Sequence, residues 1–206
     1  MSAIPIDIEV SEEFRLLHAK ISGFVRTSLD PISLQVDTEE RIPEETVDAI
    51  RRLGLFGLPV PKAYGGLGLT TVEEMLVYEE LTQTNACYRS RIGTSNGIGS
   101  MGIVYDGTEE QKRTYLPRIA SGEYTTAFAL TEPDAGSDAA NIRTAAVLEG
   151  DHWVLNGNKV FITNADQARL FTVIALTDEK KRASGGVTAF IVEHGMPGFT
   201  VGAADV

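Results

Sequence analysis

The sequence has a single cysteine, Cys87, which excludes an intrachain disulfide and a cysteine zinc cage. So few cysteines suit a reducing compartment. No stretch approaches the roughly 18 apolar residues of a membrane span. Residues 1–10 resemble neither a secretory signal nor a transit peptide. We therefore predict a cytoplasmic protein without a membrane span.

Positive charge is also scarce, since 18 Lys and Arg residues face 29 Asp and Glu residues and the net charge is −11. Nucleic-acid and anionic membrane partners both require basic patches, so neither is expected. The one short basic run, Lys180-Lys181-Arg182, precedes Ser184-Gly185-Gly186. We predict a solvated loop tip there rather than a docking site.

Common catalytic and nucleotide-binding motifs are missing or stand in the wrong context. There is no G-x-S-x-G elbow, and the three histidines are scattered, which argues against a metal site. Residues 97–102 fit G-x-G-x-x-G, but polar residues precede them and too short a segment for a crossover helix follows. We instead expect these glycines to let two helices pack closely.

Two titratable features have ordinary interpretations. His18 stands at the edge of an apolar stripe and is expected to be a partly buried histidine. Glu79 and Glu80 are adjacent, and adjacent helix positions point in different directions. We therefore expect solvation or local pairing for these two carboxylates rather than acid–base chemistry.

Helical periodicity dominates the first part of the chain. Apolar residues recur at helical spacing over residues 10–24, with Ser11 as a candidate cap. A second helix is predicted between Pro43 and Gly54. A third, rich in small residues, is predicted over residues 88–103.

Two further helices carry start signals of their own. Thr70 with Glu73, and Thr108 with Gln111, have the spacing of a capping box, and each pair precedes a helix-favouring run. Pro117 lies inside the second run and is expected to shorten or kink that helix.

After residue 123 the pattern changes to short strands and tight turns. Strand-favouring runs cover residues 124–130, 145–148, 152–155, 160–163, 170–177 and 187–192. Asn156-Gly157 between apolar runs predicts a hairpin turn. The fold class is therefore predicted as α+β, with a helical domain at 1–123 and a β domain at 124–206.

One loop at the end of a predicted strand is rich in small and hydroxyl-bearing residues: Phe128-Ala129-Leu130-Thr131-Glu132-Pro133-Asp134-Ala135-Gly136-Ser137-Asp138. Its N–H groups and short donors suit an anionic ligand such as a dinucleotide pyrophosphate, or a flavin edge. A tight structural turn explains the same residues equally well. Its predicted partner is a strand, Phe161-Ile162-Thr163-Asn164, with an aromatic ring and a hydroxyl suited to covering a flat ring.

At these two segments the sequence closely resembles the acyl-CoA dehydrogenase family. Residues 129–138 match the first signature of that family, although Asn141 replaces the small residue usual at its end. Residues 159–164 match the second flavin segment, with Phe161 where many members carry tryptophan. The resemblance extends over nearly the whole chain through Phe56-Gly57-Leu58, Tyr64-Gly65-Gly66, residues 107–112 and Tyr115-Leu116-Pro117.

The resemblance implies a helical amino-terminal domain, an antiparallel β-barrel middle domain and a carboxy-terminal helical bundle. Thr131 and Thr163 would place hydroxyls near the flavin ring, and Ser137 would also bind the acyl-CoA. FAD would lie against Phe128, Leu130, Thr131, Gly136, Ser137, Phe161, Ile162 and Thr163.

The implied reaction is the α,β-desaturation of an acyl-CoA thioester, as in fatty-acid β-oxidation. A glutamate removes the α-proton, hydride passes to the flavin, and an electron-transfer flavoprotein takes the electrons. That glutamate belongs to the carboxy-terminal region of the family, whereas this chain ends at Val206. No catalytic residue is therefore assigned, and Glu132 belongs to the binding loop.

We accordingly expect a truncated barrel, no carboxy-terminal bundle and a chain that is inactive alone, as a fragment or as half of a two-chain enzyme. The full-length family members are commonly oligomers. A flavin oxidase or monooxygenase of the same fold, and a non-catalytic FAD- and acyl-CoA-binding subunit, remain alternatives.

The sequence says less about the length and polarity of the substrate's acyl chain. Arg89 and Arg91 lie on the helix that lines the acyl pocket in the family. They favour a shorter or polar acyl chain if they face the pocket. The alternative is that both arginines face solvent or pair with acids.

Overall fold

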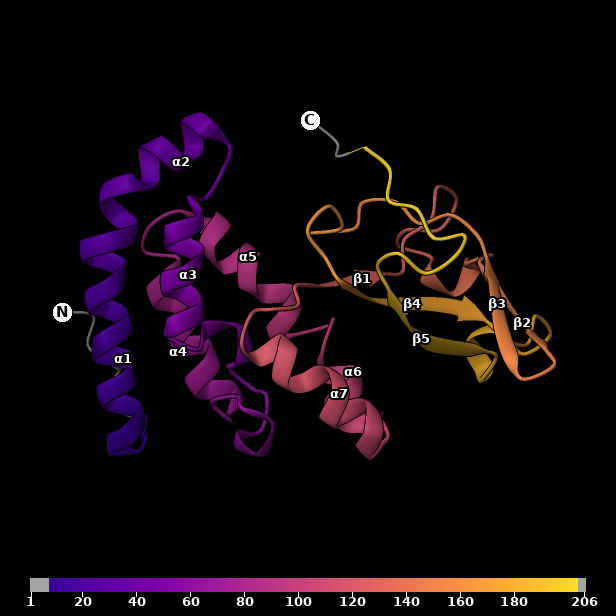
Figure 1. Ribbon diagram of the computed structural model, residues 1–206, viewed down its shortest axis with the longest axis horizontal. Helices are drawn as coiled ribbons and strands as arrows, with labels where there is room; N and C mark the ends of the chain where they lie inside the picture. The colour runs from indigo at the N-terminus through magenta and orange to yellow at the C-terminus, as the bar shows by residue number, and fades with distance from the viewer. Residues whose placement is uncertain (1–7, 204–206) are drawn as a thin grey trace.

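The computed structural model describes residues 8–203, with the helices at one end and the strands at the other (Figure 1). The predicted outer ends of the two domains, residues 1 and 206, lie outside this range. The order of helices first and strands after confirms the α+β class. The helices are α1 (Glu12–Phe24), α2 (Ser33–Glu39), α3 (Glu44–Arg52), α4 (Thr71–Leu81), α5 (Ala86–Asn96), α6 (Met101–Asp106) and α7 (Glu109–Ala120). The strands are β1 (Thr126–Ala129), β2 (Ala145–Glu149), β3 (His152–Asn156), β4 (Leu170–Leu176) and β5 (Val187–Glu193).

The predicted helix starts are confirmed by their hydrogen bonds. The Ser11 hydroxyl accepts from the Phe14 amide at 3.1 Å at the start of α1. In α4 the Glu73 amide donates to the Thr70 hydroxyl at 3.3 Å, and the Thr70 amide donates back to the Glu73 carboxylate at 2.9 Å. Thr108 and Gln111 form the same reciprocal pair in α7. Each pair satisfies backbone donors that the first helical turn leaves free.

Two expectations about the later helices are corrected. Pro117, expected to shorten or kink α7, does not shorten it, since the helix continues to Ala120 with Leu116 and Ile119 fully buried around the proline. The single helix expected over residues 88–103 is two helices, α5 and α6, separated by a turn at Gly97.

The glycine-rich turn between α5 and α6 lies against a strand rather than against another helix. A Cβ built on Gly99 would be 2.2 Å from the Thr126 hydroxyl oxygen of β1 and 2.8 Å from the Thr94 carbonyl oxygen. Only glycine permits that approach. Close packing is therefore correct for Gly99, although its neighbour is the strand β1 and not a second helix, whereas nothing lies within 4 Å of the Cβ position of Gly102.

The strands form one five-stranded sheet in the order β1-β4-β2-β3, with β5 also pairing β4. β2 pairs β3 and β4 pairs β5 in antiparallel fashion, whereas β4 runs parallel to both β1 and β2. The sheet is therefore mixed, whereas the expected β domain was antiparallel. About forty residues separate β1 from β4, enough for the crossover that a parallel pair needs. No pairing among residues 8–203 closes the sheet into a barrel.

The hairpin signal at Asn156-Gly157 was also misread. The hairpin between β2 and β3 turns at Gly150, whose φ is 65°. Gly157 follows β3 instead, and a Cβ there would be 2.3 Å from the Thr144 hydroxyl oxygen. Residues 157–168, including the expected strand at 160–163, are loop. Gly157 is needed for a close approach rather than for a tight turn.

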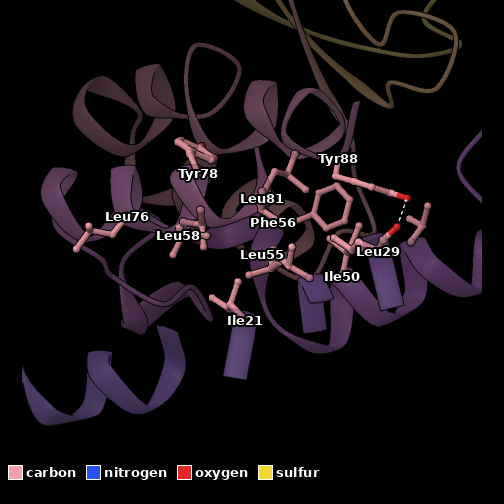
Figure 2. Close-up of a cluster of buried hydrophobic side chains, with 14 of the residues drawn as sticks. Ile21, Leu29, Ile50, Leu55, Phe56, Leu58, Leu76, Tyr78, Leu81 and Tyr88 are labelled. Atoms are coloured by element: carbon pink, nitrogen blue, oxygen red, sulfur yellow. Dashed lines mark hydrogen bonds between the residues drawn. The ribbon is translucent and has the colours of Figure 1, made fainter. Parts of the chain in front are cut away.

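The largest core lies among the helices and contains Ile21, Leu29, Ile50, Phe56 and Tyr88 (Figure 2). The Tyr88 hydroxyl donates to the Leu29 carbonyl oxygen at 3.2 Å, so the polar end of this buried ring is satisfied.

A second cluster joins the helices to the sheet, because Val60, Ile103, Leu116 and Ile119 pack against Leu170 of β4. Figure 1 shows α6 and α7 on the side of the helical part nearest the sheet. The two parts thus share buried apolar surface.

His18 and Glu80 form a buried pair between α1 and α4. The side chains are only 6% and 3% exposed, and His18 Nε2 lies 3.7 Å from Glu80 Oε1. Glu79, by contrast, is exposed. The expected solvation therefore describes Glu79, whereas Glu80 is buried and its neighbour is a histidine on another helix rather than a local partner.

Candidate functional site

The first predicted segment leaves β1 and closes into a tight turn. Glu132 and Ala135 exchange two backbone hydrogen bonds, at 3.0 and 3.1 Å, around Pro133-Asp134. Phe128, Leu130 and Thr131 before this turn are half-buried, whereas Gly136 and Ser137 beyond it are exposed. The two backbone hydrogen bonds therefore close the turn immediately before the two exposed residues, Gly136 and Ser137.

The Glu132 carboxylate organises the interior of this loop. It is 7% exposed and accepts four hydrogen bonds. The donors are the Arg143 amide at 2.6 Å, the Thr144 amide at 2.9 Å, the Thr144 hydroxyl at 2.5 Å and the Lys159 ammonium at 2.7 Å. A buried carboxylate needs such partners, so Glu132 is a structural centre of the loop.

The same contacts set the ionisation of Glu132. Burial alone would raise its pKa, but the hydrogen bonds from Lys159, Thr144 and two backbone amides outweigh burial and lower the pKa to about 2. A general base must take up a proton near the working pH. Glu132 cannot do this, which agrees with its assignment to the binding loop.

The second predicted segment lies beside the first. The Val160 amide donates to the Thr131 carbonyl oxygen at 2.9 Å, and the Lys159 ammonium donates to the Leu130 carbonyl oxygen at 2.9 Å. The structure thus brings together residues about thirty positions apart, as the site prediction requires.

Beyond Val160 the chain exposes an aromatic ring in an unusual backbone conformation. Phe161 has a φ of 56° and is 80% exposed. Thr163 is exposed as well, while Ile162 is half-buried against the sheet core. A bulky residue in the left-handed region is uncommon and costs energy, so the surrounding loop must impose it. This conformation replaces the strand expected here.

The two segments present donors without protein partners. Within residues 8–203, the hydroxyls of Thr131, Ser137 and Thr163 form no hydrogen bond to another side chain or to the backbone. The amides of Gly136, Ser137 and Thr163 likewise donate to no other described residue. The buried Thr144 hydroxyl nearby is by contrast satisfied by Glu132. This donor set fits the polar edge of a flavin or a pyrophosphate, with Phe161 as a flat apolar neighbour.

A basic residue ties down the far end of the first loop. Arg182 Nη2 donates to the Ala140 carbonyl oxygen at 3.3 Å, the Asn141 side chain at 3.3 Å and the Ile142 carbonyl oxygen at 3.0 Å. The expected solvated loop tip is therefore wrong for Arg182, because its guanidinium satisfies backbone acceptors. Lys180 and Lys181 remain exposed.

The two arginines of α5 differ. Arg89 is exposed, with its guanidinium carbon 5.0 Å from the centre of the Tyr78 ring. Arg91 is half-buried over Phe56 and donates to the Thr125 hydroxyl at 2.9 Å. Neither forms an ion pair with a carboxylate of the described chain. Solvent exposure thus describes Arg89, whereas Arg91 is neither solvated nor paired with an acid.

Sequence reasoning missed Thr144, and it placed Lys159 and Asn164 in the second segment without assigning either one a role in supporting the site. The opposite charges of Glu132 and Lys159 in the two matching segments were a readable signal for one of these contacts. The Thr144 contact was not readable, because Thr144 lies in neither segment and only the fold brings its hydroxyl to Glu132.

Two other kinds of site were sought in residues 8–203. No helix there is long and apolar enough to cross a membrane. No group of three or more histidine, cysteine, aspartate or glutamate side chains gathers there in a way that could bind a metal ion.

Known proteins resemble the chain along almost its full length. The family model for the acyl-CoA dehydrogenase N-terminal domain matches residues 11–123, and the model for the middle domain matches residues 127–205. The short-chain specific acyl-CoA dehydrogenase of Clostridium acetobutylicum is 38% identical over 96% of this chain and 52% of its own.

Solved structures agree. A chain in a study of the electron transferring flavoprotein of Acidaminococcus fermentans matches with a TM-score of 0.90 and 35% identity, over 98% of this chain and 53% of that one. A glutaryl-CoA dehydrogenase of Mycobacterium smegmatis in complex with FADH2 matches with a TM-score of 0.83 and 34% identity, over 93% of this chain and 48% of that one.

This chain spans about half the length of the curated relatives that it matches. Two family models nevertheless account for nearly all of it, in the order and at the junction where helices give way to strands. The chain therefore belongs to the acyl-CoA dehydrogenase family.

Proposed function

We propose that this chain is the FAD- and acyl-CoA-binding part of an enzyme that desaturates acyl-CoA thioesters between the α and β carbons. The observation that carries the proposal is the pair of joined segments, 128–137 and 159–164. They present three hydroxyls without protein partners, those of half-buried Thr131 and of exposed Ser137 and Thr163, and one exposed aromatic ring, above the hydrogen-bonded Glu132 and Lys159. Family membership and a relative solved with FADH2 support the same cofactor.

The residues that would hold FAD follow from this surface. Phe161 would cover one face of the ring system, and the hydroxyls of Thr131 and Thr163 would bond to its polar edge. The free amides of Gly136 and Ser137 would bind phosphate or carbonyl oxygens. Phe128, Leu130 and Ile162 would supply apolar contact beneath. Ser137, exposed at the edge of the loop, would also contact the acyl-CoA.

When bound, FAD would accept the hydride from the β carbon. This chain's own residues would orient the ring and keep water from its covered face. Proton abstraction from the α carbon would fall to a residue outside this half of the fold, because Glu132 stays ionised and fully hydrogen-bonded. We therefore assign no catalytic residue here and propose that the chain alone does not turn over acyl-CoA.

The proposed partners follow the same reasoning. An acyl-CoA would be the substrate and an electron-transfer flavoprotein the electron acceptor, consistent with the neighbour described in a study of such a flavoprotein. The whole enzyme would be a cytoplasmic homo-oligomer.

Titration of the purified chain with FAD tests this proposal. We expect saturable quenching of flavin fluorescence, and a further change in the visible spectrum when acyl-CoA is added. We also expect no bleaching of the flavin by acyl-CoA under anaerobic conditions. Absence of FAD binding would contradict the proposed site, whereas bleaching would show that the chain contains a base of its own.

A further inference from the structure

The exposed residues of the second segment stand between two anchors. On one side, Lys159 and Val160 bond to the first segment, which belongs to the sheet part of the molecule. On the other side, Asn164 bonds to α5 of the helical part. Only three residues, 161–163, separate these anchors. Both Phe161 and Thr163 are exposed, so nothing packed over them holds them in place.

The Asn164 anchor is specific in its geometry. Its Nδ2 donates to the Thr94 hydroxyl at 2.8 Å, with the Ser90 carbonyl oxygen at 3.4 Å. Thr94 and Ser90 lie one turn apart on α5 and therefore share a face of the helix. Thr94 is 8% exposed, so the contact reaches a buried hydroxyl.

The backbone of Asn164 also shapes the loop. Its φ is 63°, and its carbonyl oxygen accepts from the Gln167 amide at 3.0 Å and the Ala168 amide at 2.8 Å. Asparagine tolerates the left-handed region better than most residues. Its side-chain NH₂ can in addition donate to two acceptors, which an aspartate in the same place could not do.

We propose that Asn164 and Thr94 are positioning residues for the cofactor: their contact sets the orientation of Phe161 and Thr163 and couples it to the placement of α5. This inference rests on the FAD site proposed above. It adds that the helical part controls flavin binding through one side-chain contact, although none of the predicted cofactor residues lies on a helix. Without this contact the segment would keep its Lys159 end, the packing of Ile162 and the turn at Asn164, but its exposed residues would lose their link to α5.

Three single substitutions and one double substitution separate this role from a general effect on folding. Asn164→Gly keeps the left-handed backbone accessible and removes only the side chain. Thr94→Val keeps the shape of the partner and removes its hydroxyl. Gln167→Ala is the matched control, since it removes an exposed amide from the same turn. The measurements are the FAD dissociation constant, the visible circular dichroism of bound flavin and the thermal unfolding of the FAD-free chain.

Asn164→Gly and Thr94→Val are each expected to weaken FAD binding roughly three- to tenfold, the value of one hydrogen bond. Each should change the flavin circular dichroism, which a purely structural contact would leave unaltered. The double variant should be no weaker than the weaker single variant, and Gln167→Ala should stay within about twofold of wild type.

Equal FAD affinity and equal flavin circular dichroism in wild type and both single variants would overturn the inference and leave the proposed function intact. Additive losses in the double variant would also overturn it, because the two residues would then act separately. Failure of the wild type itself to bind FAD would remove the proposed function and this inference together. If Asn164→Gly does not fold, Thr94→Val decides alone.

Discussion

The Lys159 ammonium lies 2.7 Å from the Glu132 carboxylate and 2.9 Å from the Leu130 carbonyl oxygen. One side chain thus joins the two segments that form the candidate cofactor surface. Both residues of this ion pair are well buried, with side-chain exposures of 10% for Lys159 and 6% for Glu132. Their charges are therefore poorly screened by solvent, and losing either one leaves the other without compensation.

Lys159→Met should destabilise the fold strongly. It leaves Glu132 buried and charged, for which the expected loss is about 3 kcal/mol in the free energy of unfolding. Urea unfolding of wild type and variant measures this loss of unfolding free energy. The control is Lys181→Met, whose ion pair with Asp178 is well exposed and should contribute less than about 1 kcal/mol. Equal effects of the two changes would show that burial of the Lys159 pair does not matter.

Acid should weaken the fold through Glu132. Its pKa falls from 4.5 to about 2 on folding, so its stabilisation is fully present above about pH 4.5. That contribution, of order 3 kcal/mol, is lost as the pH falls through 4.5 towards 2. Unfolding free energies from pH 6 to 2 should show this loss in wild type and a clearly smaller loss in Glu132→Gln. If the unfolding free energies of wild type and Glu132→Gln fell in parallel with pH, Glu132 would not be the group responsible for the loss.

Gly157→Ala should destabilise the loop that carries Lys159. The added methyl group would stand 2.3 Å from the Thr144 hydroxyl oxygen and 2.7 Å from the Thr144 Cα, so backbone or side chain must move. We expect a loss of about 1–3 kcal/mol in unfolding free energy. Gly102→Ala is the control, because nothing lies within 4 Å of its Cβ position. In helix α6 it should be neutral or slightly stabilising.

Phe161→Ala should separate cofactor binding from stability. The ring is 80% exposed, so its removal should change the unfolding free energy by less than about 1 kcal/mol. FAD affinity should fall at least severalfold, because the flat contact surface is lost. Phe161→Trp should retain affinity. A variant that binds FAD as well as wild type would exclude Phe161 from the site.

The local parts of the fold were predictable from sequence, and the non-local parts were not. Ser11, Thr70 and Thr108 announce helix starts through contacts three residues away. The loop at 160–163 reads as a strand because Val160, Phe161 and Ile162 favour strands. Its left-handed turn at Phe161 arises from anchors on Leu130, Thr131 and α5, and no pattern within the segment encodes those.

The candidate site divides in the same way. The resemblance named the exposed hydroxyls and the aromatic ring, which are the groups proposed to meet the ligand. It did not indicate that Glu132 is fully hydrogen-bonded or that Asn164 reaches a helix seventy residues away. Parallel pairing of β1 with β4 was equally hidden, because strand direction depends on the route of the connecting chain.

Amide hydrogen exchange with and without FAD tests the central claim most directly. The account predicts that FAD slows exchange in two separate stretches, residues 130–138 and 160–164, and leaves α1 and α2 unchanged. Protection confined to the helical part, or no protection in either stretch at saturating FAD, would contradict it.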